Sequence, residues 1–184
     1  MKTMIHKGTK QINTERLILR RFEMGDEESM YRNWASNPKV TKFLTWQAHE
    51  SVDDSREIIA LWLARYEDVR FYQWAIELKE TREPIGSISV VKVDDEIDEV
   101  EVGYCIGESW WGFGYTAEAF RGVIDYLFSE VKPKKIRAKH DKDNPNSGRV
   151  MQKCGLTYDK TLYGAGKNIS NPRCDLVLYS ISAK

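Results

Sequence analysis

The residues best suited to chemistry lie in a short glycine-rich turn. Gly107, Gly112 and Gly114 fall between an apolar segment that ends at Ile106 and a helical pattern that begins near Tyr115. Glycine lets the backbone approach a ligand closely. The first turn of a helix leaves about four N–H groups without partners and carries about half a positive charge. The turn is therefore a candidate phosphate-binding site.

Two familiar phosphate-binding motifs do not fit this turn. A P-loop needs a lysine followed by Ser or Thr, and the turn contains no such pair. A dinucleotide fingerprint needs three glycines early in an alternating α/β unit, whereas Gly112-x-Gly114 supplies two and antiparallel hairpins are predicted before it. A glycine-rich turn that binds no ligand remains the alternative.

The surrounding chain is typical of a single α+β domain. We expect residues 1–12 to form a flexible tail and residues 13–184 to form the domain, whose mixed, mostly antiparallel sheet has about six to seven strands with helices on both faces. Alternating or short apolar runs predict strands over residues 17–19, 71–78, 85–93, 96–106, 135–140, 156–163 and 175–181. Apolar residues at helical spacing and capping signals predict helices over residues 26–35, 51–66, 115–131 and 144–154.

Two of these strands should be parallel neighbours. The strand over residues 96–106 leads through the glycine turn and a helix into the strand over residues 135–140, and such crossovers are right-handed. The next helix should begin at Asn144-Pro145, with the asparagine as its N-cap and the proline in its first position.

The composition narrows the possible partners. The 184 residues carry 28 basic and 28 acidic side chains, so no overall field attracts nucleic acid. No apolar run approaches the roughly 20 residues of a membrane helix, and the first residues do not form a signal peptide. The three cysteines are widely spaced, which fits neither a zinc site nor a disulfide framework. We expect a cytoplasmic protein without metal, nucleic-acid partner or membrane contact.

Several short segments stand in a recognisable order: Thr14–Arg20, Glu101–Tyr104, Trp111–Tyr115 with Glu118-Ala119, Asn144-x-x-Ser147 with Arg149-Val150, and Lys153–Leu156. Together they resemble the GNAT superfamily of acetyl-coenzyme A-dependent N-acetyltransferases over about residues 14 to 182. The resemblance is greatest to the branch of ribosomal-protein N-terminal acetyltransferases.

Three positions depart from that family's pattern. Trp111 stands where Gln or Arg is usual, and Thr116 stands where Gly or Ala is usual. Met151 occupies the position at which many members carry a tyrosine that protonates the leaving thiolate.

The resemblance implies acetyl-CoA as co-substrate and a splay between the two parallel strands. The pantetheine arm would lie in that splay and bond the backbone of Tyr104, Cys105 and Ile106, while Asn144 and Ser147 approach from the other side. The pyrophosphate would bind the turn and the first helical amides, at Gly112, Phe113, Gly114, Tyr115, Thr116 and Ala117.

Acetyl transfer to an amine also needs proton transfer. Glu101 is the candidate general base, because it shares a strand face with Gly103 near the expected thioester. The alternative for Glu101 is a cross-strand pair with a base such as Lys92. Ser147 is the candidate proton donor to the thiolate, and its alternative is a supporting role in the first turn of its helix. Cys105 has no histidine near it in sequence, so we interpret it as a small strand residue.

The favoured hypothesis is an N-acetyltransferase, monomeric or homodimeric, that acts on a primary amine at a protein N-terminus or in a small molecule. A CoA-binding module without catalysis is the alternative that Met151, Trp111 and Thr116 suggest. A nucleotide-binding domain of another type is a third. We expect the first helices and the loop from Gly164 to Pro172 to choose the acceptor.

Overall fold

One eight-stranded sheet forms the centre of the computed structural model, which describes residues 4–183. The strand order is β1-β2-β3-β4-β5-β6-β8-β7, and every neighbouring pair is antiparallel except β5 and β6. The strands are β1 (Ile12–Asn13), β2 (Leu17–Arg20), β3 (Gln73–Leu78), β4 (Glu83–Asp94), β5 (Glu99–Ile106), β6 (Lys135–Asp141), β7 (Thr157–Gly166) and β8 (Cys174–Ser182).

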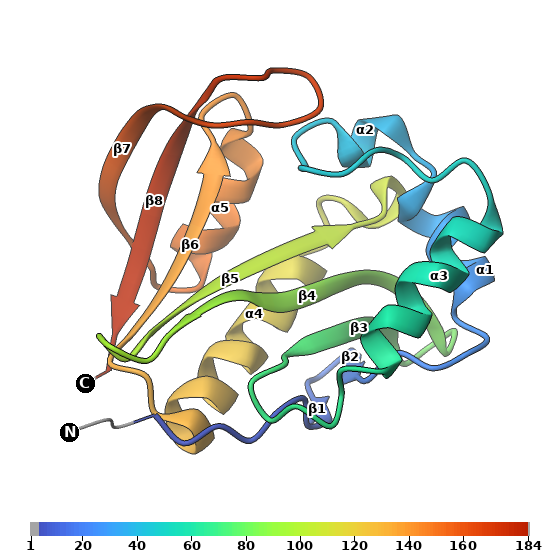
Figure 1. Ribbon diagram of the computed structural model, residues 1–184, viewed down its shortest axis with the longest axis horizontal. Helices are drawn as coiled ribbons and strands as arrows, with labels where there is room; N and C mark the ends of the chain where they lie inside the picture. The colour runs from blue at the N-terminus through green and yellow to red at the C-terminus, as the bar shows by residue number, and fades with distance from the viewer. Residues whose placement is uncertain (1–3, 184) are drawn as a thin grey trace.

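Helices cover both faces of this sheet (Figure 1). The short helices and α3 lie on one face, here called the front, and α4 and α5 lie on the back. The α-helices are α1 (Glu27–Met30), α2 (Pro38–Thr41), α3 (Val52–Leu63), α4 (Tyr115–Tyr126) and α5 (Pro145–Lys153). The chain continues as a π-helix after α1 (Tyr31–Ala35) and after α4 (Leu127–Val131), and a 3₁₀ turn (Glu108–Trp110) follows β5.

Each face of the sheet has its own apolar cluster. The back cluster fills the space beneath α4 and α5 and includes Trp74, Tyr104 and Phe120. The front cluster is smaller and includes Phe22 and Trp34. Two separate clusters arise because strand side chains alternate between the faces, and they hold β5 between two layers of helices.

The predicted fold class is confirmed. The structure is a single α+β sheet with helices on both faces and one parallel pair, and it has one strand more than the upper expected number. The additional short strand is β1, whose two residues pair with Leu19 and Ile18. None of the helices among residues 4–183 is long and apolar enough to cross a membrane.

The segment before β1 differs from the flexible tail that we expected. Thr9 is buried, and its hydroxyl donates to the carbonyl of Phe71 over 3.0 Å. The amide of Ile5 donates to the carbonyl of Val131 over 2.8 Å. Residues 4–12 are therefore bound to the domain by hydrogen bonds to distant backbone groups, and residues 1–3 lie outside the described residues.

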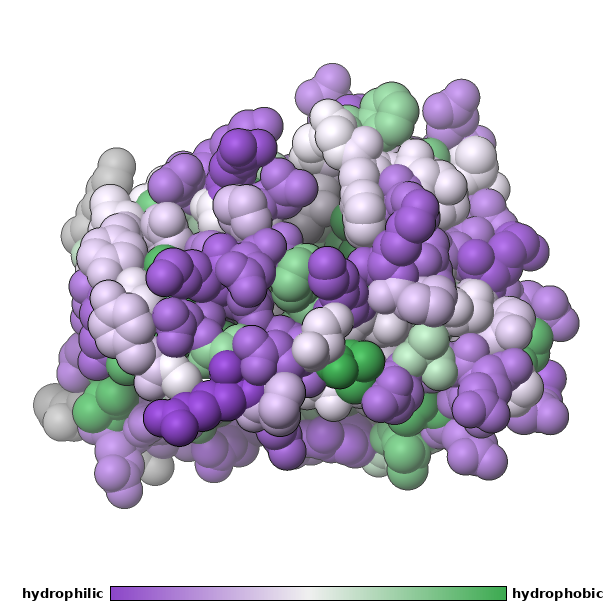
Figure 2. All heavy atoms as spheres, turned by 90° about the horizontal axis from the view of Figure 1, so that it is seen from above, coloured by the Kyte–Doolittle hydropathy of each residue, from purple (hydrophilic) through white to green (hydrophobic). Residues whose placement is uncertain are grey.

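The end toward which β5 and β6 diverge is mainly hydrophilic. Figure 2 looks from above, onto the end toward which β5 and β6 diverge, and shows mainly hydrophilic residues with small, separate hydrophobic patches.

Candidate active site

The parallel strands β5 and β6 separate partway along their length. They pair only at Glu99↔Lys135, Val100↔Ile136 and Glu101↔Arg137. Beyond that point β5 stays paired with β4 as far as Ile106, and β6 stays paired with β8 as far as Asp141. The two facing edges diverge, as Figure 1 shows. Backbone groups on these edges can therefore bond an extended ligand inserted between them.

A β-bulge in β4 lies beside the point of separation. The register between β4 and β5 shifts between Val90 and Lys92, which leaves Val91 as an extra residue. Bulges increase the local twist of a strand pair, so this one helps to turn β4 and β5 away from β6. Val91 leans over Gly103, where an added Cβ would lie 3.0 Å from its Cγ1. Glycine at 103 therefore keeps this part of the front face shallow.

The glycine turn follows β5 and leads into α4. Gly112 and Gly114 have φ angles of +85° and +83°, a region that L-residues with side chains avoid. Gly114 is the N-cap of α4, and the first helical bond runs from the amide of Glu118 to its carbonyl over 3.0 Å. The amides of Tyr115, Thr116 and Ala117 precede that bond, so the helix supplies them with no partner. These groups fit an anion such as a pyrophosphate.

Trp111 fixes the turn to the end of β5. Its indole Nε1 donates to the carbonyl of Ile106 over 2.9 Å, although nearly half of the residue is exposed. Trp111 therefore has a structural role here: its indole ties the turn to β5, a bond that depends on a tryptophan side chain.

A second attachment of the turn comes from the beginning of β2. Thr14 and Arg16 both bind the carboxylate of Glu118, in the first turn of α4. The guanidinium of Arg16 also donates to the carbonyl of Phe113 over 3.1 Å and lies 4.3 Å from the centre of the Tyr115 ring. From the sequence, Thr14, Arg16 and Glu118 were recognised only as members of family motifs, and their contact was not predicted. The pairing of a Thr-x-Arg segment with a first-turn glutamate is the signal that would have indicated their contact.

The N-terminus of α5 faces the same splay from the side of β6. The Tyr104 hydroxyl donates to the Ser147 carbonyl over 2.9 Å, and the Ser147 hydroxyl donates to the Tyr104 oxygen over 3.1 Å. These bonds connect β5 to α5 directly. Burial raises the pKa of Tyr104, so its phenol keeps its proton at neutral pH. Asn144 stands at the N-cap as expected, but its side chain makes no capping bond, which corrects our expectation that it caps the helix.

Glu101 lies on the front face, at the last pair before the strands separate. Its side chain is 17% exposed, and its Oε1 lies 2.8 Å from Nζ of Lys139 on β6. Lys92, the partner that we considered, is opposite Glu101 in the sheet register but lies near Asp94 instead. The carboxylate therefore forms the cross-strand pair with a base that was its alternative role, but the base is Lys139 on β6 rather than Lys92 on β4.

Three other side chains near the splay point away from its front. His140 is buried on the back face, where its Nδ1 donates to the carbonyl of Asp141 over 2.7 Å. Cys105 faces the front cluster, its Sγ lies 3.4 Å from the Ser87 hydroxyl, and burial raises the pKa of the thiol. Met151 is buried in the back cluster. None of these three side chains shares the position of Glu101 at the front of the splay.

Two loops meet above the front face. The Ile169 amide, in the loop between β7 and β8, donates to the carbonyl of Leu44 over 3.1 Å. Asn168 in the same loop donates to the Asp141 carboxylate at the end of β6. Of the aromatic residues in and near the first helices, Trp34 and Phe71 are buried core residues, whereas Trp46 is half-buried beside His49.

The sequence comparisons agree with this geometry. A family model described as an acetyltransferase (GNAT) domain matches residues 16–157. The chain belongs to the GNAT acetyltransferase family. The chain is 32% identical over 151 residues to an uncharacterized N-acetyltransferase, p20, of Bacillus licheniformis, and the match covers 79% of this chain and 84% of the relative. It is 30% identical over 151 residues to the uncharacterized N-acetyltransferase YoaA of Bacillus subtilis, which covers 82% and 85% of the two chains.

Solved structures show the same fold. A GNAT-family acetyltransferase from Bacillus anthracis superposes with a TM-score of 0.81 at 24% identity, over 94% of this chain and 98% of that one. The microcin C7 self-immunity acetyltransferase MccE, in complex with acetyl-CoA and AMP, superposes with a TM-score of 0.82 at 22% identity, over 98% and 99%. This GNAT protein is therefore an acetyl-CoA-dependent acyltransferase with acetyl-CoA as its co-substrate.

Proposed function

We propose that this acetyltransferase moves the acetyl group of acetyl-CoA directly to a primary amine that approaches from the front face. The observation that carries the proposal is the splay of β5 and β6. The glycine turn and the N-terminus of α5 lie at its margins, and the Glu101 carboxylate lies at its front. A coenzyme arm and an acceptor can therefore meet from opposite faces of the sheet.

The coenzyme-binding groups come from three elements. Backbone groups of Tyr104 and Ile106 on the free edge of β5 bond the arm, and one N–H polarises the thioester carbonyl. Cys105 lies between them, but its carbonyl is directed toward Gly86 on β4. The turn from Gly112 and the first amides of α4 hold the pyrophosphate. Asn144 contributes from the start of α5, because its side chain makes no bond to its own helix.

Glu101 acts as the general base. Its carboxylate takes a proton from the acceptor amine, directly or through a water molecule, and the nitrogen then attacks the acetyl carbon. The ion pair with Lys139 holds this side chain across the opening of the splay. An ammonium ion of the acceptor can compete with Lys139 for the same carboxylate, which suits a substrate that arrives protonated.

Ser147 is the proposed proton donor to the departing thiolate. In this structure its hydroxyl donates to Tyr104, which keeps its own proton. Rotation of the Ser147 hydroxyl toward the splay would let it pass a proton to the thiolate while its oxygen takes a proton from a water molecule, so that no alkoxide is left and neither backbone moves. Since Met151 is buried in the core, the donor that many relatives place at that position is replaced by this pair.

The proposal is tested by thiol release from acetyl-CoA with a panel of amines: peptides with free N-termini, amino acids, polyamines and aminoglycosides. We expect at least one amine to release CoA and to gain an acetyl group by mass. Binding of CoA without transfer to any amine would support the alternative, a CoA-binding module that is catalytically inactive.

The role of Glu101 is tested by replacing it with glutamine. General acid–base groups typically contribute 100- to 10,000-fold, so Glu101→Gln should lower kcat by about 100-fold or more, and most strongly at low pH. Glu99→Gln is the matched control, since Glu99 lies on the same face two residues earlier and pairs with Arg137. Near-normal turnover of Glu101→Gln at all pH values would end the assignment.

A further inference from the structure

The first turn of α4 contains an acid at the place proposed for the pyrophosphate. Glu118 is the only acidic residue of that turn, and its side chain is 14% exposed. A carboxylate there interacts favourably with the helix N-terminus but also repels a second anion at the same end. A phosphate-binding turn with this residue needs a way to offset its charge.

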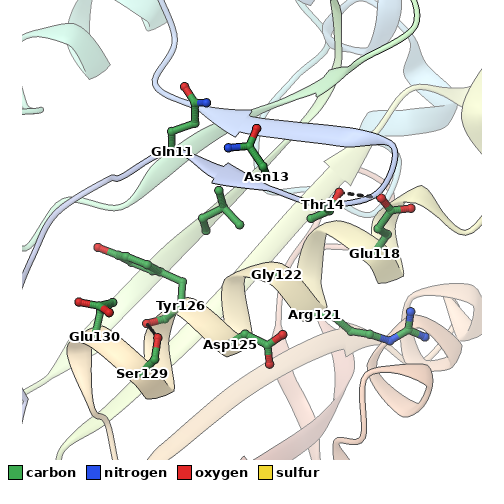
Figure 3. Close-up of a pocket in the computed structure, with 11 residues that line it drawn as sticks. Gln11, Asn13, Thr14, Glu118, Arg121, Gly122, Asp125, Tyr126, Ser129 and Glu130 are labelled. Atoms are coloured by element: carbon green, nitrogen blue, oxygen red, sulfur yellow. Dashed lines mark hydrogen bonds between the residues drawn. The ribbon is translucent and has the colours of Figure 1, made fainter.

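Arg16 and Thr14 offset it from another part of the chain. The Arg16 Nε donates to Glu118 Oε2 over 2.7 Å, and the Arg16 amide donates to Oε1 over 2.7 Å. The Thr14 hydroxyl donates to the same Oε1 over 2.6 Å, a bond that Figure 3 shows between the β1–β2 hairpin and α4. Burial alone would raise the pKa of Glu118, but these bonds outweigh it and hold the pKa below its ordinary value.

The same guanidinium orients the turn itself. Arg16 Nη1 donates to the Phe113 carbonyl over 3.1 Å. The C=O and N–H groups of a trans peptide point in opposite directions, so this bond directs the Gly114 amide away from Arg16. An added Cβ at Gly114 would lie 3.7 Å from Arg16 Nη2, which shows how closely the side chain approaches the turn. One face of the guanidinium also lies over the Tyr115 ring, in a cation–π contact.

We propose that Arg16 is a positioning residue for coenzyme binding: it neutralises Glu118 and so lets the turn accept a pyrophosphate, while its bond to the Phe113 carbonyl keeps the guanidinium beside the turn. This inference rests on the proposed function, in which the turn binds that group. The groove beside this cluster, about 600 Å³ between α4 and the β1–β2 hairpin, is lined by Thr14 and Glu118 but not by Arg16. The guanidinium lies on the side of the turn.

The test compares four proteins by the dissociation constant of CoA. Arg16→Gln leaves Glu118 charged without its cation, and we expect about a ten-fold weaker complex. Glu118→Gln and the double variant Arg16→Gln/Glu118→Gln should both bind within about three-fold of the wild type, because neither contains an uncompensated carboxylate. If the double variant binds as weakly as Arg16→Gln, Arg16 does not act through Glu118 and the proposal is overturned.

Two controls separate charge from folding. Thr14→Val removes a bond to Glu118 without changing the charge balance. We therefore expect a lower Tm, but a dissociation constant for CoA within about two-fold of the wild-type value. Arg16→Lys keeps the positive charge and replaces Arg16→Gln in the comparison if that variant does not fold. Its dissociation constant for CoA should lie within about three-fold of the wild-type value. A ten-fold loss in either control would contradict the charge-based role.

A third comparison distinguishes this inference from the proposed function. Gly112→Val disturbs the turn through its φ of +85°, and an added Cβ there has no atom within 4 Å. If Gly112→Val weakens CoA binding but Arg16→Gln does not, only the role of Arg16 fails; if neither does, the turn is not the pyrophosphate site. Arg16→Gln should weaken the binding of 3′-dephospho-CoA by the same factor as the binding of CoA. If the dissociation constant of this analogue is unchanged in Arg16→Gln, Arg16 acts on the ribose phosphate, and the proposal is overturned.

Discussion

Replacing Gly148 with alanine should destabilise the protein, although alanine is the better helix former. Gly148 lies in α5 above the ring of His140 on β6. An added Cβ would lie 2.6 Å from His140 Nε2, 3.1 Å from Cε1 and 3.2 Å from Cδ2, whereas ordinary contacts begin near 3.4 Å. The ring cannot easily retreat, because its Nδ1 donates to Asp141 and its centre lies 5.8 Å from that of Tyr179.

The magnitude follows from two opposing effects. Alanine in a helix interior gains about 1 kcal/mol over glycine, while overpacking a tight site costs about 1–3 kcal/mol. Three ring atoms are too close at once and the ring is confined, so the upper end of that range applies. We therefore expect a net loss of about 1–2 kcal/mol in the free energy of unfolding. For a domain of this size each kcal/mol lowers the Tm by about 2–4 °C.

The loss should also reach the active site. An outward shift of α5 lengthens the bonds between Ser147 and Tyr104, so the KM for acetyl-CoA should rise together with the loss of stability. The assays are urea unfolding followed by tryptophan fluorescence and steady-state kinetics on the folded variant.

Gly122→Ala in α4 is the matched control. There an added Cβ would lie 3.1 Å from a methyl of Thr14 and 3.3 Å from a methyl of Ile12, and the hairpin that carries them can yield. We expect the free energy of unfolding of Gly122→Ala to lie within about 1 kcal/mol of that of the wild type. A Gly148→Ala protein as stable as the wild type would refute the reasoning, as would failure of His140→Ala to restore stability in the Gly148→Ala background.

Three further predictions follow from the same structure. Gly114→Val, at a φ of +83°, should raise the KM for acetyl-CoA about ten-fold or more without changing that for the amine, and an unchanged KM would remove the turn from the site. Tyr104→Phe removes the hydroxyl that joins β5 to Ser147; urea unfolding should show a loss of about 1–3 kcal/mol, and steady-state kinetics a lower kcat, whereas unchanged values of both would contradict the role of this pair. Burial raises the pKa of Cys154 to about 11, so its thiolate forms only as the pH rises toward that value; alkylation at pH 8.5, measured by mass spectrometry, should be much slower than in the unfolded chain, and equal rates would disprove it.

The elements set by local signals could be predicted from the sequence. The helices expected over residues 51–66 and 144–154 are present: Ser51 and Asp54 form a capping box at the start of α3, and Gly155 adopts a positive φ after α5. The parallel pairing of β5 and β6 follows from the helical crossover between them. Each of these features depends on residues close together in the chain, which is why pattern and capping rules suffice.

Features that depend on distant contacts could not be predicted in the same way. The segment before β1 has little apolar pattern, and its order comes from bonds such as that of Thr9 to Phe71. The π-helical continuation of α4 over Leu127–Val131 packs into the back cluster, and helical periodicity does not distinguish it from an α-helix.

The candidate site shows the same division. The glycine turn and the edge of β5 were recognisable from their residues, since glycine and helix termini carry local signals. The contact of Arg16 with Glu118 joins residues 102 positions apart, and that of Tyr104 with Ser147 joins residues 43 apart. Charge and hydroxyl chemistry alone do not indicate which of many possible partners such side chains meet.

The elements proposed to bind acetyl-CoA are separate from two loops that contact each other through Ile169 and Leu44. The groups proposed for acetyl-CoA lie on β5, α4 and α5, whereas a backbone bond between Ile169 and Leu44 joins the β7–β8 loop to the loop after α2. Asn168 fastens one of these loops to the end of β6. Because neither loop supplies the coenzyme groups, its sequence can change without loss of the acetyl donor. Proteins that share this fold and the donor can therefore differ in their acceptor, and we propose that the residues beside this contact select it.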